Sequence, residues 1–454
     1  VTPPDNGILL SYNNGYSAFA QAHENRQNAV LFTSNDGFLY ALGYTNSTTN
    51  PNPSILWGWM PQGLLQSLSN YNSFWQSGSM QGGITETDAA NNGTWHSYAV
   101  GSALNGGILY SLQLTGASQL GLGNTVVEYD LNTSGSTFTQ PLDQAPAIYT
   151  DPLSGDTLAA WSENVTSATG STSSEVLLMN VATGQLYIMP VSGTLTSMPI
   201  FDSNGDLFVA AGSTVYEDSN TQLMSEVNKK TTGVANSLTN ATTINNAFSS
   251  QFTLSTPSGA NPSTQIEYLQ SATVNGTSWM TVESSNGIWA YNDNSSWAPQ
   301  WFSGIGDSAV YTSSGWSTPS SSNAIVQIPS GGYVSNPALI VNNSVILPVS
   351  VQSTSGNTCS LPTAYYNLYK LSNGANPNNL FTNINGNSIQ SASILIGYGT
   401  SFTPTVSIMN GKVLVQSSAS NTDSSNTFLA ATSSGLLVGG PIQSALTYYG
   451  QLKP

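Results

Sequence analysis

Short apolar runs separated by turn residues follow one another along the whole chain, and helical periodicity is almost absent. The runs are rich in Val, Ile, Leu, Tyr, Phe and Trp, and most have the length of a single strand. Gly, Asn, Ser and Pro, the usual turn residues, stand between them. The pattern predicts an all-β protein.

Many of these segments share one form, in which an apolar strand leads through a turn containing Asn or Gly into a second strand. Two strand-like runs joined by such a turn are typical of a β-hairpin. We therefore expect hairpins over residues 30–42, 98–114, 176–190, 279–291, 338–349, 365–374, 402–416 and 427–440.

Hairpins that recur over a long chain indicate a β-propeller or a related radial array. Seven or eight four-stranded blades would use roughly 55–65 residues each, above the usual repeat of about 40–50, so we expect long loop insertions. Residues 217–265 are rich in Ser, Thr and Asn and are expected to form a surface insertion with a short helix near 222–237. No stretch resembles an interdomain linker, so we expect a single domain over 1–454.

Charged residues make up only 6% of the chain, with 6 Lys+Arg against 22 Asp+Glu and a net charge of -16 at pH 7. An average soluble domain has about 25%. In strong acid the carboxylates are protonated, and few positive charges remain to repel one another. Acid unfolding comes largely from protonating paired carboxylates, and few such pairs can form here. The composition favours a protein exposed to acid, although a neutral adhesive surface would have the same composition.

Several functions are excluded or disfavoured by the same numbers. Six basic residues cannot neutralise a run of phosphates, so we exclude nucleic acid as a partner. No apolar stretch is long enough for a membrane span. Two His and one Cys, Cys359, cannot build a zinc site or an internal disulfide, so no metal is expected.

An extracellular or cell-surface location, periplasmic in a Gram-negative cell, is expected. The chain opens with Val-Thr-Pro-Pro, which is typical of a processed terminus. Asn-X-Ser/Thr sequons, which are N-glycosylation acceptors in secreted proteins, also favour this location. The sequons begin at Asn46, Asn92, Asn132, Asn164, Asn240, Asn275, Asn294 and Asn342.

Blade-like motifs occur in order along the chain. Residues 35–42 (NDGFLYAL) are followed by an aromatic-Pro strand at 56–61 (LWGWMP), and similar segments lie at 93–110 and 334–369. These segments resemble the quinoprotein-like β-propeller superfamily, in particular its PilY-type pilus-tip branch. The resemblance implies a propeller fold.

The calcium loop of that branch is only half matched. Asp202, Asn204 and Asp206 stand at its first positions, but Phe208 and Ala210 occupy later ligand positions. Calcium needs six or more oxygen ligands, and quinone cofactors need charged contacts that this chain lacks. We expect no cofactor.

In fold, length and composition the chain is similar to the tetrathionate hydrolases of acidophilic sulfur oxidisers. The resemblance implies an acid-stable secreted hydrolase that converts tetrathionate to thiosulfate, sulfate and sulfur. It also implies a small anionic sulfur substrate and self-association as a homodimer or larger assembly. The alternatives are a non-enzymatic pilus-tip-like adhesin, a filament-forming cell-surface propeller, or a scaffold that binds glycans through Trp and Tyr.

Two aspartates are the candidate catalytic residues. Asp307 lies in a Gly-rich turn flanked by Trp301 and Trp316, where backbone N–H groups could depress the pKa of a carboxylate that activates water. The alternative for Asp307 is a turn cap. Asp293 is the second candidate, although the residues around it indicate an exposed turn.

Cations are the candidate substrate-binding residues. Arg26, the only arginine, could bind a sulfonate bidentately together with His23, or it could form an ion pair that fastens the first residues. His96 could hold a second sulfonate, and Trp301 and Trp316 could line the site. Cys359 is a weaker catalytic candidate. Glu86 and Asp88 are expected in a loop before a strand, without a ligand, and Asp36 in a structural turn.

Overall fold

The computed structural model describes residues 1–438 except 13, 35, 44–52, 66–79, 81, 143–144, 228–240, 246, 249, 294–295, 322–323, 342, 353–360, 378–380, 383–390, 410–411 and 417–434. Its contacts divide the chain into two compact units. Unit 1 comprises residues 1–211 and 216–250, and unit 2 comprises residues 212–215 and 251–454. The expectation of a single domain stays a prediction.

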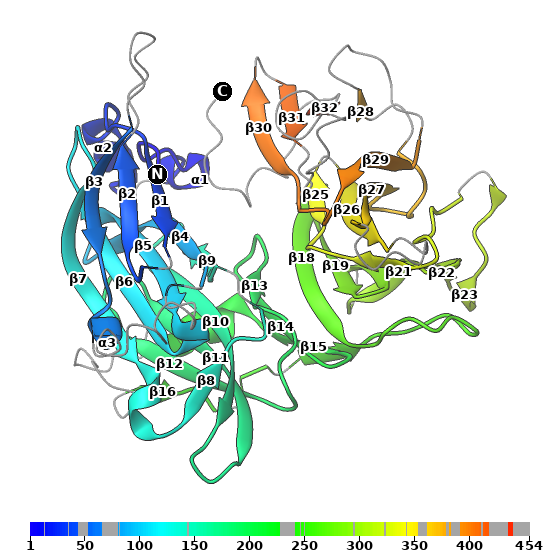
Figure 1. The fold of residues 1–454 in the computed structure, drawn as a ribbon, viewed down its shortest axis with the longest axis horizontal. Coiled ribbons are helices and arrows are strands. Elements are labelled where there is room, and N and C mark those ends of the chain that lie inside the picture. The colour runs from blue at the N-terminus through cyan, green and yellow to red at the C-terminus, as the bar shows by residue number, and fades with distance from the viewer. Residues whose placement is uncertain are drawn as a thin grey trace. The chain divides into compact units, whose positions relative to one another are not determined.

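Unit 1 is built from antiparallel sheets of consecutive strands (Figure 1). The sheet orders are β1-β2-β3, β4-β5-β6-β7 and β16-β12-β11-β10-β8, with β9 also paired to β10. The short β16 runs parallel to β12. The strands are β1 (Ala29–Thr33), β2 (Leu39–Gly43), β3 (Ser54–Trp59), β4 (Ile84–Asn91), β5 (Thr94–Ala103), β6 (Ile108–Thr115), β7 (Gly121–Asp130), β8 (Thr137–Thr139), β9 (Ala147–Thr150), β10 (Thr157–Thr166), β11 (Thr172–Asn180), β12 (Leu186–Val191) and β16 (Thr242–Thr243).

A fourth sheet has the order β13-β14-β15-β17. Its strands are β13 (Ile200–Phe201), β14 (Leu207–Ala211), β15 (Thr214–Asp218) and β17 (Ser250–Thr253). The turn between β13 and β14 is closed by Asp202, whose Oδ1 accepts hydrogen bonds from the N–H groups of Asn204 and Asp206 at 2.8 and 3.0 Å. The Asp202-to-Asp206 segment thus forms a hairpin turn in the described structure.

Unit 2 contains three further sheets. Their orders are β18-β19-β20-β21-β22-β23, β24-β26-β27-β29 with β25 beside β26, and β28-β32-β31-β30. The strands are β18 (Ile266–Val274), β19 (Thr277–Ser284), β20 (Gly287–Asn292), β21 (Ala298–Gly304), β22 (Asp307–Thr312), β23 (Gly315–Ser317), β24 (Gly332–Val334), β25 (Leu339–Val341), β26 (Ser344–Val351), β27 (Thr363–Lys370), β28 (Phe381–Thr382), β29 (Ser393–Tyr398), β30 (Thr405–Met409), β31 (Lys412–Gln416) and β32 (Gly435–Val438).

The helices of the described residues are short. They are α1 (Gly7–Leu10), α2 (Tyr16–Ala22), α3 (Gln62–Leu65) and α5 (Asn220–Val227), with 3-10 turns η2 (Leu104–Gly106) and η3 (Leu131–Ser134). Helix α1 begins after Asn6, whose side chain accepts hydrogen bonds from the N–H groups of Ile8 and Leu9, as an N-cap does. Helix α5 lies where a short helix is predicted near 222–237, and residues 228–237 are outside the described residues.

Most of the predicted hairpins are confirmed. Antiparallel strand pairs cover 30–42, 98–114, 176–190, 279–291, 338–349 and 402–416. The segment 365–374 is different, because it supplies the single strand β27, which pairs with β26 and β29. In 427–440 only β32 is described, so that predicted hairpin lies largely outside the described residues.

The chain is therefore all-β and of the β-propeller type, in which consecutive strands pair antiparallel into successive blade-like sheets. Local turn chemistry explains why the sequence predicts this class: the two-residue Asn-Gly loops after β4 and β18 have positive φ at both positions, as type I′ hairpin turns require. The number of blades stays a prediction.

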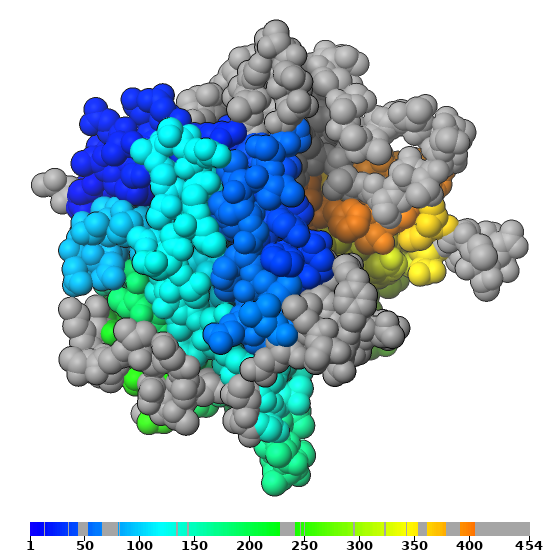
Figure 2. All heavy atoms as spheres, turned by 60° about the vertical axis from the view of Figure 1, so that its left-hand side comes forward, coloured from blue at the N-terminus to red at the C-terminus, as the bar shows by residue number. Residues whose placement is uncertain are grey.

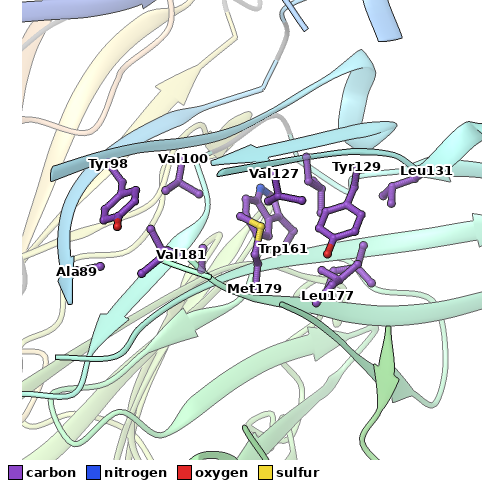
Figure 3. Close-up of a cluster of buried hydrophobic side chains, with 14 of the residues drawn as sticks. Ala89, Tyr98, Val100, Val127, Tyr129, Leu131, Trp161, Leu177, Met179 and Val181 are labelled. Atoms are coloured by element: carbon purple, nitrogen blue, oxygen red, sulfur yellow. The ribbon is translucent and has the colours of Figure 1, made fainter. Parts of the chain in front are cut away.

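The largest core of unit 1 lies between the β4–β7 sheet and the β8–β12 sheet. Figure 3 shows Trp161 of β10 surrounded by Val127, Met179 and Leu177, with Tyr129 beside them. All of these side chains are buried. Strand β11 buries side chains on both faces over Val176–Met179, so this part of its sequence is a continuous apolar run.

The N-terminal helices pack on the second sheet of unit 1. Leu9, Tyr16 and Ala20 form a small buried cluster with Ala90 of β4 and Trp95 of β5. Figure 2 shows the face of unit 1 on which these first residues and the strands β1–β7 form a continuous surface. This packing carries Arg26, just after α2, against β4 and β5.

Candidate functional site

The predicted site residues fall into two groups, one in each unit. His23, Arg26 and His96 belong to unit 1, whereas Asp293, Trp301, Asp307 and Trp316 belong to unit 2. Each group is described by itself.

Arg26 is the centre of a buried polar cluster. Its side chain is 1% exposed, Nη1 donates a hydrogen bond to Ser97 Oγ at 2.9 Å, and Nη2 donates to the Thr2 carbonyl at 2.6 Å. Glu86 Oε1 lies 3.7 Å from Nη2, an ion-pair distance without a hydrogen bond. Ser97 Oγ in turn donates to Asp88 Oδ1 at 2.6 Å. Arg26 therefore fastens the first residues to β4 and β5, which is the alternative to a free anion clamp.

The expectation that Glu86 and Asp88 lie in a loop before a strand is wrong. Both lie on β4, paired with β5. Asp88 accepts two hydrogen bonds, from Ser97 and from the Tyr16 hydroxyl at 2.6 Å. The sequence ITETDAAN does not predict a strand, because polar residues occupy both of its faces near the start. These residues become buried only when α2 and Arg26 pack on them.

Both carboxyl groups of this cluster hold protons more tightly than free side chains. Burial raises the pKa of Glu86 to about 8, with Asp88 adding to the shift and Arg26 opposing it. Burial also raises the pKa of Asp88, against the hydrogen bonds from Ser97 and Tyr16 and the charge of Arg26. In acid both carboxyls are neutral, which leaves the guanidinium of Arg26 and the ammonium group of Val1 as the charges of the cluster.

Two half-buried histidines lie within electrostatic range of each other in unit 1. His23 Nδ1 donates to the Phe19 carbonyl at 2.8 Å and its ring packs on Phe19 at 4.5 Å between centroids. His96 lies on β5 with its ring edge-to-face to Tyr98. Burial, with a smaller contribution from His23, lowers the pKa of His96. Both rings belong to unit 1, which also contains Arg26.

Asp307 begins β22 directly after an exposed turn. Gly306 of that turn has φ +67, and Asp307 is half-buried. Its Oδ1 accepts a hydrogen bond from the N–H of Ser308 at 2.7 Å, as expected for a turn cap, which leaves Oδ2 on a half-exposed side chain. Asp293 follows β20 and is exposed, with its N–H donated to the Ser278 carbonyl. The catalytic roles of both aspartates stay predictions.

The two candidate tryptophans have different surroundings. Trp301 is fully buried, its Nε1 donates to the Leu371 carbonyl at 2.7 Å, and its ring stacks on Tyr369. Trp316 on β23 is half-buried, and its Nε1 donates to Ser255 Oγ at 3.0 Å. Of the two, only Trp316 has an accessible face, so it is the better placed to contact a ligand. Cys359 lies outside the described residues.

Sequence reasoning missed two fully buried glutamates. Glu163 on β10 accepts a hydrogen bond from Gln140 Nε2 at 3.1 Å, and burial raises its pKa well above the ordinary value. Glu283 on β19 accepts from Thr281 Oγ1 and from the Ala338 N–H, both at 2.9 Å, and burial raises its pKa to about 7. The signal was present: each is a carboxylate inside an otherwise strand-like run, where charge is rare.

The backbone beside Glu163 is strained. Leu104 and Asn105 both have φ +52, and Gly106 has φ +98. Positive φ is unusual for a residue such as Leu. A Cβ at Gly106 would lie 2.5 Å from Glu163 Oε1, so glycine is required for the loop to pass over the carboxyl group.

Among the residues that the structure describes, no group of three or more His, Cys, Asp or Glu side chains could hold a metal ion. None of the helices in the described ranges is long and apolar enough to cross a membrane.

No family model and no curated protein matches the chain. Among solved structures it is similar to the WD40 domain of SCAP from fission yeast, with 10% identity and a TM-score of 0.38 over 92% of this chain and 80% of that one. It is also similar to Chaetomium thermophilum Sqt1 bound to the N-terminus of a ribosomal protein, with 8% identity and a TM-score of 0.38 over 85% and 89%. Both similarities are too low to carry an argument, and the class rests on the sheet topology described above.

Proposed function

We propose that the protein is a secreted, acid-stable hydrolase that cleaves tetrathionate to thiosulfate, sulfate and elemental sulfur. One water is consumed and two protons are released for each tetrathionate. Water attacks a sulfonate sulfur, the adjacent S–S bond breaks, and its electron pair leaves on the disulfane sulfonate, which loses one sulfur atom to give thiosulfate.

One observation supports this proposal above the others: seven carboxyl groups among the described residues have a raised pKa, in each case chiefly through burial. These groups are Glu86, Asp88, Glu163, Glu175, Asp218, Glu267 and Glu283. Such groups favour the folded state in acid, where they are neutral, and oppose it when they ionise. A fold with this set of buried carboxyls is suited to an acidic medium.

The substrate class follows from the cations that remain in acid. Carboxylates are neutral there, whereas sulfonates are anions of strong acids and keep their charge. His23 and His96 are half-exposed in unit 1, and the buried Arg26 lies in the polar cluster of the same unit. We assign the two histidines to sulfonate binding in unit 1. For unit 2, taken by itself, we assign Asp307 to activation of the attacking water.

Turnover tests the proposal directly. The purified protein is incubated with tetrathionate at about pH 3, below the ordinary pKa of Asp and Glu, and released thiosulfate is measured. We expect release that depends on folded protein. A folded sample that releases no thiosulfate would refute the hydrolase.

Variants then test the residues separately. Asp307→Asn should abolish turnover, while Asp293→Asn, at an exposed turn, should change it little. His96→Gln should raise KM for tetrathionate with a smaller effect on kcat, because it removes a cation that binds substrate and transition state alike. An active Asp307→Asn protein would exclude an essential role for Asp307.

A second candidate function is a non-enzymatic adhesin or filament-forming surface protein. One feature favours it: Val30, Leu42 and Ile55 stand in one row across β1, β2 and β3, and Val30 and Ile55 are 55% and 63% exposed. Exposed apolar rows are typical of association surfaces. Ordered oligomers or filaments without thiosulfate release would support this candidate over the hydrolase.

A further inference from the structure

The sequons within the described residues differ in structure, and two of them have the same unusual setting. Asn92-Gly93 connects β4 to β5 and Asn275-Gly276 connects β18 to β19, each as a two-residue loop. The φ angles are +50 and +79 at the first loop, and +52 and +78 at the second. In both, the sequon threonine is the first residue of the following strand.

Both loops are open to solvent. Asn92, Gly93, Asn275 and Gly276 are all exposed. A Cβ placed at either glycine would have nothing within 4 Å. Asn92 Nδ2 donates a hydrogen bond to Asn91 Oδ1 at 3.0 Å, but both side chains are exposed, so a bulky group on either loop asparagine has room in the folded protein.

Asn164 shows the opposite environment. It lies inside β10, its Nδ2 donates to the Leu195 carbonyl at 2.9 Å, and its Oδ1 accepts from the Leu195 N–H at 3.0 Å and from Ser174 Oγ at 2.7 Å. The side-chain amide thus pairs with both the carbonyl and the N–H of Leu195, as the backbone of a neighbouring strand would. A sugar on Nδ2 would break these contacts.

Asn132 is also engaged. Its Oδ1 accepts a hydrogen bond from the Phe138 N–H at 3.2 Å, and its Nδ2 packs directly over Gly107. The remaining sequons, at Asn46, Asn240, Asn294 and Asn342, lie outside the described residues.

We propose that Asn92 and Asn275 are N-glycosylation sites and that Asn164 and Asn132 are not. The donor is an oligosaccharide on a lipid phosphate carrier. Asn Nδ2 forms a bond to the anomeric carbon of the first sugar, the bond from that carbon to the carrier phosphate breaks, and Nδ2 loses one proton. The proposal rests on the extracytoplasmic location expected above, independently of the hydrolase.

Such glycans would keep the protein soluble in acid, where few of its side chains are charged. The surface loses its negative charge in acid, and only the 6 Lys+Arg and 2 His remain to keep copies apart. A neutral glycan is hydrated at every pH, so it supplies solubility that ionised side chains cannot supply there.

Peptide mapping by mass spectrometry of the protein purified from its native cells tests the proposal. Peptides with Asn92 and Asn275 should carry hexose-containing adducts, and peptides with Asn164 and Asn132 should be unmodified. Thr94→Ala and Thr277→Ala remove each sequon but keep the Asn-Gly turn, and each should lower the intact mass by one glycan. Thr166→Ala, in the Asn164 sequon, is the matched control and should leave the glycan mass unchanged.

Several results would overturn the proposal. One is that Asn92 and Asn275 are both unmodified in protein recovered from the medium or envelope. Another is that the only modification found at these two asparagines is conversion to aspartate. A third is a glycan on Asn164 or Asn132. Recovery of the protein from the cytoplasm alone would overturn it together with the expected location, and thiosulfate release measured on the same sample reports on the hydrolase separately.

Discussion

Glu283 illustrates how a single buried carboxyl group sets pH dependence. It is fully buried, and its two oxygens accept hydrogen bonds from Thr281 and from the Ala338 N–H. Burial raises its pKa to about 7 in the folded protein, above the ordinary value of about 4.3. The folded state therefore binds this proton more tightly than the unfolded state, and stability falls as the pH rises through that interval.

Glu283→Gln should stabilise the protein at pH 8 and change little at pH 3. The amide oxygen can accept from the Ala338 N–H, and the amide nitrogen can donate to Thr281. The gain at pH 8 is on the order of 3 kcal/mol, since one pKa unit corresponds to about 1.4 kcal/mol. Chemical denaturation at the two pH values measures it, with Glu24→Gln at an exposed position as control. An equal effect at both pH values would contradict the ionisation argument.

At the scale of the element, the sequence specifies the fold most directly through the residues of its hairpin turns. Gly205 lies in the turn between β13 and β14 with φ +86, and a Cβ there would overlap the Tyr149 ring. Gly93 lies in the turn between β4 and β5 with φ +79 and open space around it. The two glycines share the need for positive φ but differ in packing.

Gly205→Ala should therefore destabilise the protein more than Gly93→Ala. Left-handed backbone alone costs about 1–2 kcal/mol for alanine. The overlap with Tyr149 brings the expected loss for Gly205→Ala to about 2–4 kcal/mol. Urea unfolding midpoints of the two variants measure the difference. Equal losses would show that the Tyr149 ring moves aside freely.

At the scale of the whole molecule, the protein should be more stable at pH 3 than at pH 8. Burial raises the pKa of Glu86 to about 8, of Glu283 to about 7 and of Asp218 to about 6, so each opposes folding only above the ordinary pKa of its side chain. The net charge of -16 at pH 7 adds self-repulsion in the same direction. His96, whose pKa is lowered, acts the other way but is half-exposed.

Thermal unfolding at a series of pH values tests this prediction. The midpoint should fall from pH 3 to pH 8, and added salt should change the midpoint at pH 3 little, because the carboxyl group of the Arg26–Glu86 pair is neutral there. Protein that melts readily at pH 3 but resists heat at neutrality would contradict the acid adaptation.

The sequence by itself determined the fold class, because hairpins form between neighbours in the chain and their turn residues indicate them. Asn92-Gly93 and Asn275-Gly276, for example, favour the type I′ turns that they form. The sequence also shows directly that ionic groups are few. It could not show that Asp88 and Glu86 form a buried cluster with Arg26, since Ser97 reaches Arg26 across 71 residues and burial arises only when α2 packs on β4 and β5. Tertiary structure likewise decided which carboxyls resist ionisation and which sequons stay open to solvent. Desolvation and steric room depend on segments that are distant in the chain.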